Sequence, residues 1–233
     1  MDLIAATTFS VVNVMCRLLF TYKRVPKPYL NPILEEFQNF YRRYCGTDRL
    51  SYGALGFNNT SISDVRGTGL PECDHLQFPK MPFKYAMYHI RYRNGPGVTS
   101  IANTHPFVLD RYIFMHNGRI KSLDNQNNKT DSELFFELII LLHTGTTTLK
   151  DALNKALLQL PKKPKPLINM VMFDKYTGEF IVYHHSSGVP SLFWDSQRGI
   201  VANWQIPNSK EIKMLWRPAY NRKPDPHHRP VGE

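Results

Sequence analysis

The order of the periodic segments along this sequence is the feature that most limits the folds it can adopt. A short apolar, strand-like run at residues 17–22 comes first, and a helical stripe over residues 31–45 follows it. Further strand-like runs lead to two helical patterns, at residues 130–143 and 148–160, and more strand-like runs come after them. Strands that alternate with one helix and then with a helix pair predict a single α+β domain in which sheets and helices form layers.

Local signals support the individual elements. In the first helical stripe, Pro32 is expected in the first turn, where a proline costs least. A Thr-x-x-Glu capping box opens the second helical pattern, which we expect to pack against the third. Residues 167–185 and residues 190–204 each predict a hairpin, because two strand-like runs flank a short turn that contains glycine.

Charge and composition narrow the function classes. The 233 residues include 29 Lys plus Arg against 19 Asp plus Glu, a net charge of +10 that favours anionic partners. The basic residues are scattered in short groups, and no motif that reads nucleic acid is present, so nucleic acid is not an expected partner. A hydrophobic fraction of 42% is ample for a buried core and excludes a chain that is disordered throughout.

The three cysteines, Cys16, Cys45 and Cys73, are odd in number and show no C-x-x-C spacing. They predict neither a disulfide framework nor a zinc site, and they fit a reducing cytoplasm best. The opening residues lack a basic segment ahead of their apolar ones, and no segment approaches the length of about 18 apolar residues that spans a bilayer. We therefore expect a soluble protein without a membrane partner, and the sequence indicates no metal or organic cofactor.

Four short motifs place polar side chains where a scaffold alone would not need them: HIRYR (89–93), NTHPF (103–107), HNGRI (116–120) and TDSE (130–133). Arg91 interrupts an apolar, strand-like run. It could be an edge residue whose charged end reaches the solvent, or its planar guanidinium could bind a substrate carboxylate. Both interpretations stay open from this residue alone.

The other motifs also have two interpretations each. Asn117 and Gly118 form the commonest signal for a two-residue hairpin turn, but a side-chain amide and a glycine N–H could equally stabilise a developing oxyanion. Asp131 could complement the dipole at the start of a helix, or it could hold a substrate ammonium group. No single motif decides between these alternatives.

Together and in this order, with Cys16 in front of them, the motifs resemble those of the class II glutamine amidotransferases, whose nucleophile is an N-terminal cysteine. The resemblance spans residues 16–205 and includes residues 186–203, which look like a hairpin of that family. It implies the four-layer αββα sandwich of the N-terminal-nucleophile hydrolases, an α+β fold with glutamine bound at the open end of the two sheets. The chain looks most like the compact, stand-alone type, in which the amidotransferase domain is the whole protein.

The resemblance implies which residues are catalytic. Cys16 matches the nucleophile, and Asn117 and Gly118 match the pair that binds the oxyanion. We hypothesise that the free α-amino group of Cys16, with a pKa of about 8, takes the thiol proton directly or through water. The sulfur would then attack the glutamine carboxamide, ammonia would leave, and water would hydrolyse the γ-glutamyl thioester to glutamate.

The resemblance also implies which residues bind substrate. Arg91 matches the residue that clamps the α-carboxylate of glutamine, Asp131 the one that receives its α-ammonium group, and His105 a residue that lines the same pocket. The chemistry agrees, since a zwitterionic amino acid needs one cation and one anion a few ångströms apart. Two departures from the family pattern are Tyr92, where many relatives carry Trp, and the segment VANW (201–204), where they have Ser-Glu.

The position of Cys16 conflicts with this mechanism, because residues 1–15 precede it and its nitrogen is then part of a peptide bond. Three explanations are open: translation starts at Met15, whose removal exposes Cys16; or residues 1–15 are a propeptide that is cleaved; or the chain is inactive. We expect the amidotransferase-like domain to cover residues 16–216. Residues 217–233 have four prolines and almost no aliphatic side chains, which predicts a disordered basic tail.

Two functions of different classes follow. The first is an enzyme that releases ammonia from glutamine for an acceptor on a partner, either a separate synthase or an acceptor-carrying subunit. The second is a catalytically inactive amidotransferase-like protein that binds or regulates a partner. Nucleic-acid binding is a third hypothesis, and it rests only on the net charge and the 12 tyrosines.

Overall fold

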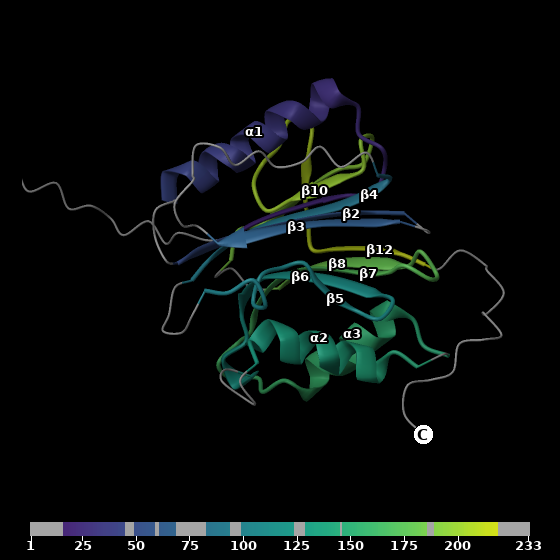
Figure 1. Cartoon of the computed structure of the whole chain (residues 1–233). Helices are drawn as coiled ribbons and strands as arrows, with labels where there is room; N and C mark the ends of the chain where they lie inside the picture. Colours follow the sequence, from purple (N-terminus) through teal and green to yellow (C-terminus); the bar gives the residue numbers. More distant parts are fainter. Residues whose placement is uncertain are drawn as a thin grey trace, which may run out of the picture.

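The described part of the chain forms four layers. In the computed structural model, helix α1 covers one sheet, a second sheet packs on the other face of the first, and helices α2 and α3 cover the outer face of the second (Figure 1). This αββα arrangement confirms the predicted fold class. The structure describes residues 16–44, 49–58, 61–68, 83–93, 99–123, 129–144, 146–185 and 189–218.

The first sheet has seven strands and is antiparallel throughout, in the order β11-β9-β10-β1-β4-β2-β3. Its first strand, β1, lies in the interior of the sheet between β10 and β4. β4 pairs with the whole of β1, from Arg17 to Thr21, whereas β10 pairs only with Leu19 to Thr21. The strands are β1 (Arg17–Thr21), β2 (Leu50–Phe57), β3 (Ile62–Thr68), β4 (Tyr85–Tyr92), β9 (Leu192–Asp195), β10 (Ile200–Ala202) and β11 (Lys210–Ile212).

The second sheet has five antiparallel strands in the order β12-β8-β7-β6-β5. They are β5 (Phe107–Leu109), β6 (Tyr112–Arg119), β7 (Leu167–Asp174), β8 (Phe180–His185) and β12 (Met214–Arg217). The pairs β7–β8 and β9–β10 confirm the two predicted hairpins. The predicted tail begins at residue 217, and residues 219–233 lie outside the described part of the chain, as do residues 1–15.

The helices are α1 (Lys27–Tyr44), α2 (Asp131–Leu142) and α3 (Leu149–Gln159), with one 3₁₀ turn at Lys121–Leu123. Thr130 caps α2 in the predicted capping box, and α2 packs against α3 as expected. The predicted start of α1 is wrong, because Pro32 lies inside the helix and not in its first turn. The carbonyl of Pro26 accepts bonds from residues 29 and 30, and the side chain of Leu30 is buried in the core, so packing extends the helix toward its N-terminus.

The apolar core consists of one layer on each side of the two sheets and one layer between them. The layer between the sheets is rich in aromatic side chains, including Phe20 of β1 and Phe57 of β2 on one side and Phe173 of β7 and Phe180 of β8 on the other. Because side chains alternate along a strand, residues two or four positions further along the same strands also face the space between the sheets. No helix in the described part of the chain is both long and apolar enough to cross a membrane.

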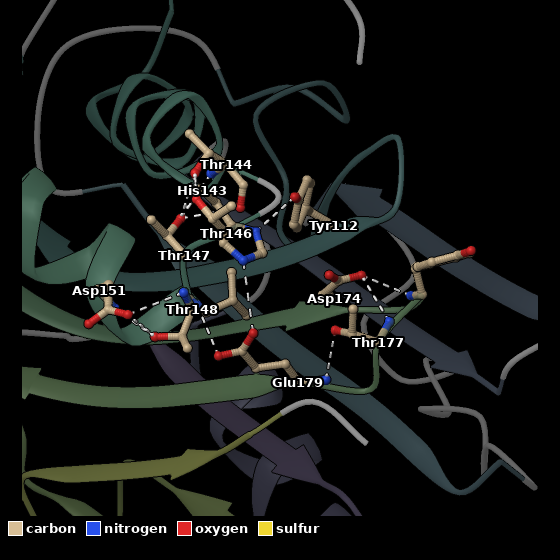
Figure 2. A network of polar contacts seen from close by, with 12 residues as sticks. Tyr112, His143, Thr144, Thr146, Thr147, Thr148, Asp151, Asp174, Thr177 and Glu179 are labelled. Atoms are coloured by element: carbon tan, nitrogen blue, oxygen red, sulfur yellow. Dashed lines mark hydrogen bonds and ion pairs between the residues drawn. The ribbon is translucent and has the colours of Figure 1, made fainter. Parts of the chain in front are cut away.

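A polar network fastens the second sheet to its helices (Figure 2). The buried carboxylate of Glu179 accepts hydrogen bonds from the backbone N–H of Leu149, at 2.9 Å, and from the indole N–H of Trp216, at 2.7 Å. One carboxylate therefore holds the start of α3 and the last strand, β12. His143, at the end of α2, approaches the same carboxylate and pairs with the hydroxyl of Tyr112 at 2.8 Å.

Candidate functional site

Cys16 lies directly ahead of β1, at one end of the sandwich. Its sulfur accepts a hydrogen bond from the backbone N–H of Tyr92, at the end of β4, with an N···S distance of 3.3 Å. Burial raises the pKa of the Cys16 thiol, while the Tyr92 N–H and the charge of Arg91 act in the opposite direction. A nearby base is thus needed to form the thiolate at neutral pH.

The backbone carbonyl of Cys16 is held by two side-chain amides. The Nδ2 of Asn117, from β6 in the other sheet, donates to this oxygen at 2.9 Å. The Nδ2 of Asn203, from the residue after β10, donates to it at 2.8 Å. The nucleophile candidate is therefore anchored through its main chain to both sheets.

Asn117 and Gly118 do not form a turn. They lie inside β6, where they pair with Asn169 and Ile168 of β7, so the hairpin-turn interpretation is wrong. The pairing between β6 and β7 continues through the motif, because β7 supplies a partner for each of its residues. A Cβ at Gly118 would overlap the carbonyl oxygen of Leu167, which explains why a residue without a side chain fits this position.

Arg91 is not an edge residue, because β4 lies between β1 and β2. Its Nη1 is buried and has no hydrogen-bond partner among the described residues. Burial lowers the pKa of Arg91, and the negative charges of Cys16 and Asp131 oppose this effect. The edge interpretation is therefore wrong, and the guanidinium presents an unused donor inside the protein.

Asp131 is the first residue of α2 and receives two backbone hydrogen bonds. Its Oδ2 accepts from the N–H of Ile120 at 2.7 Å, and its Oδ1 from the N–H of Ser132 at 2.9 Å. These contacts agree with the helix-start interpretation. The charges of Asp131 and Arg91 both act on the Cys16 thiol, so the fold brings these three residues, from α2, β4 and the start of β1, into one electrostatic neighbourhood.

His105 lies beside a histidine that the sequence analysis did not select. The ring centroids of His105 and His89 are 4.5 Å apart, and both side chains are buried. Burial lowers the pKa of His89 to about 3 and holds that of His105 well below its ordinary value, so both imidazoles are neutral. A neutral imidazole carries one donor and one acceptor.

The site gathers most of the buried polar atoms that lack a partner. Among the described residues, nine buried side-chain atoms have no hydrogen-bond partner, and six of them belong to Ser51, His89, Arg91 and His105. Ser51 pairs with Arg91 across β2 and β4, and His89 precedes Arg91 by two residues on the same strand face. Buried polar groups are normally satisfied, so this concentration is unusual for a scaffold alone and singles out the surroundings of Arg91 as the candidate site.

Three residues of this neighbourhood, Ser51, His89 and Asn203, were missed from the sequence. The signal for His89 was available, since it shares the strand face of Arg91. Ser51 and Asn203 carry no local signal, because the site residues next to them, Arg91 and Cys16, are distant in the sequence. The described residues contain no group of three metal-ligating side chains that could hold an ion.

No protein-family model matches this sequence, and a search of curated proteins finds no match either. Solved structures match the fold. One is the glutamine phosphoribosylpyrophosphate (PRPP) amidotransferase from B. subtilis complexed with ADP and GMP, with a TM-score of 0.56 and 18% identity over 89% of this chain and 50% of that one. Another is described as the allosteric regulatory enzyme of purine biosynthesis, with a TM-score of 0.55 and 19% identity over 86% of this chain and 46% of that one. The chain thus spans about half the length of both.

Proposed function

We propose that this protein hydrolyses the side-chain amide of glutamine through a thioester on Cys16 and so releases ammonia. The observation that carries the proposal is the set of buried polar atoms without partners beside Cys16, in Ser51, His89, Arg91 and His105. A ligand with several polar groups would satisfy them, and the fold shared with glutamine amidotransferases supports glutamine as that ligand.

The charges of the site suit a free amino acid. The guanidinium of Arg91 would bind the α-carboxylate, and Asp131 would receive the α-ammonium group. The neutral ring of His105, whose nitrogens have no partner among the described residues, would donate to the same carboxylate. A ligand that lacks one of the two α-substituents would leave a buried charge unpaired and would bind more weakly.

The proposed reaction begins with the α-amino group of Cys16, once residues 1–15 are absent. That amine takes the thiol proton, and the sulfur attacks the carboxamide carbon of glutamine. The side-chain amide of Asn117 and the N–H of Gly118 stabilise the resulting oxyanion. Asn117 can serve both purposes because its NH₂ has two hydrogens and the carbonyl of Cys16 takes only one of them. The amine returns a proton to the leaving ammonia, and water then hydrolyses the thioester to glutamate.

The fate of the ammonia belongs to the same proposal. We propose a compact, stand-alone amidotransferase of the cytoplasm, whose ammonia is consumed by a separate synthase or by an acceptor on another subunit.

A second candidate is an inactive amidotransferase-like protein that binds or regulates a partner. It is favoured by the nitrogen of Cys16, which is a peptide nitrogen as long as residues 1–15 are attached. Such a protein would keep the fold and the pocket but would lack the general base.

The two candidates are separated by the intact mass of the protein expressed from its native gene, followed by an assay of glutamate release from glutamine. We expect a species that begins at Cys16 and that is active, whereas Cys16→Ser and Asn117→Ala abolish release. Cys73→Ser is the matched control for removal of a thiol and is expected to retain activity. A stable, inactive species that retains residue 1 would favour the second candidate, and unchanged rates in the two variants would mean that the site residues are misassigned.

A further inference from the structure

Asn203 makes an unusual set of contacts with the first residues of β1. It follows β10 directly, and only 1% of its surface is exposed. Its backbone N–H donates to the carbonyl of Leu18 at 3.1 Å. Its side-chain Oδ1 accepts from the N–H of Leu18 at 2.8 Å, and its Nδ2 donates to the carbonyl of Cys16 at 2.8 Å.

This side chain extends the sheet beyond the end of a strand. The ladder between β1 and β10 includes the pair of Leu19 with Ala202, and β10 ends there. A side-chain amide carries the same donor and acceptor as a peptide group, so Asn203 can supply the hydrogen bonds that the next residues of β10 would have made. The start of β1 is thereby paired on both sides, because β4 pairs with Arg17 on the other.

The consequence concerns the orientation of Cys16. Its carbonyl oxygen has two lone pairs, and the amides of Asn117 and Asn203 occupy them from opposite sheets. Without Asn203, the carbonyl would be held by Asn117 alone. Asn117 is also the side chain proposed to stabilise the oxyanion, and a loosely held Cys16 would shift relative to it.

We infer that Asn203 is a positioning residue, which fixes the main chain of Cys16 so that its sulfur and its α-nitrogen keep their places relative to Asn117. Asn203 acts through Cys16 and has no contact with the reacting atoms. This inference rests on the proposed function for its catalytic consequence, but the contact itself can be tested without any activity.

Two variants separate the donor of Asn203 from its acceptor. Asn203→Asp keeps the size and the oxygen that accepts from Leu18, but an ionised carboxylate has no hydrogen to give to Cys16. Asn203→Leu removes both contacts at similar volume. We expect kcat for glutamate release to fall about 100-fold in both variants, because a shift of about 1 Å in a catalytic group has that effect. KM is expected to change by less than about threefold, since neither Arg91 nor Asp131 is touched.

The matched control lies in β10, the strand that Asn203 directly follows. Ile200 pairs with Thr21 at the far end of the β1–β10 ladder and packs in the layer beneath α1. Ile200→Val is expected to lower the free energy of unfolding by about 1 kcal/mol, with kcat and KM within about twofold of wild type. If a general weakening of β10 lowers kcat, kcat falls in Ile200→Val as well. If loss of the hydrogen bond to Cys16 lowers kcat, it falls only in the Asn203 variants.

The second readout is the infrared band of the Cys16 carbonyl. In the full chain with Cys45→Ser and Cys73→Ser, isotope-labelled cysteine marks this one carbonyl. We expect a shift to higher frequency in both Asn203 variants, because one hydrogen bond to the oxygen is lost, and no shift in Ile200→Val. An unshifted band would overturn the inference, as would a kcat equal to wild type in Asn203→Asp. If the wild-type protein releases no glutamate, the proposed function fails, and the band alone decides whether Asn203 positions Cys16.

Discussion

His89 is expected to make the stability of this protein depend on pH in mild acid. Its ring is fully buried, and burial together with the charge of Arg91 lowers its pKa from 6.5 to about 3. Because the pKa is lower in the folded state than in the unfolded state, the unfolded state binds more protons between these values. The stability that depends on neutral His89 is therefore complete above pH 6.5 and is lost as the pH falls toward 3.

The size of the effect follows from the shift. One pKa unit corresponds to about 1.4 kcal/mol, so lowering the pH from 6.5 to about 4.5 removes roughly 2–3 kcal/mol from the free energy of unfolding. His105 acts in the same direction, because its pKa is also lowered. The contribution of His89 must therefore be isolated with a variant.

The variant is His89→Leu, which removes the titrating ring without adding a charge. Urea denaturation at about pH 7.5 and about pH 4.5 gives the free energy of unfolding of each protein. We expect the variant to lose roughly 2–3 kcal/mol less than wild type between these conditions. His185→Leu, at an exposed histidine, is the control and is expected to behave as wild type. Equal losses in wild type and His89→Leu would refute the reasoning.

Three further predictions concern the site and its support. Arg91→Lys keeps the cation but loses the planar fork, so KM for glutamine is expected to rise at least about tenfold in steady-state assays, and an unchanged KM would contradict the carboxylate role. Gly118→Ala places a Cβ against a backbone oxygen of β7 and is expected to lower the free energy of unfolding by about 2 kcal/mol in urea; an equally stable variant would show that the strands can separate there. Glu179→Ala leaves the N–H groups of Leu149 and Trp216 without their acceptor and is expected to cost about 3 kcal/mol by the same measurement, whereas a loss below about 1 kcal/mol would mean that water replaces the carboxylate.

The order of the elements could be predicted from the sequence because its signals are local. The capping box at Thr130 and the turns of both hairpins depend on residues that are neighbours in the chain, and the structure confirms them. The start of α1 could not be predicted, because packing of Leu30 against the sheet decides it. The hairpin-turn interpretation of Asn117 and Gly118 failed for a similar reason, since β7 supplies a pairing partner for each residue of the motif.

The candidate site could be predicted only in part. Motif order was enough to select Cys16, Arg91 and Asp131, which the fold brings into one electrostatic neighbourhood, while their roles in catalysis and binding stay predictions. Asn203 could not be found in this way, because it contacts a residue 187 positions away through an amide that has no local partner. Contacts of this kind depend on strand order, and strand order is set by the whole sheet.

The central claim is that glutamine is cleaved through a thioester on Cys16, and trapping that intermediate tests it most directly. Protein that begins at Cys16 is mixed with radiolabelled glutamine, quenched in acid during turnover, digested and mapped by mass spectrometry. The account predicts a γ-glutamyl group on the peptide that contains Cys16, and none in Cys16→Ser. Turnover of glutamine without label on this peptide, or label on a peptide that contains Cys45 or Cys73, would contradict it.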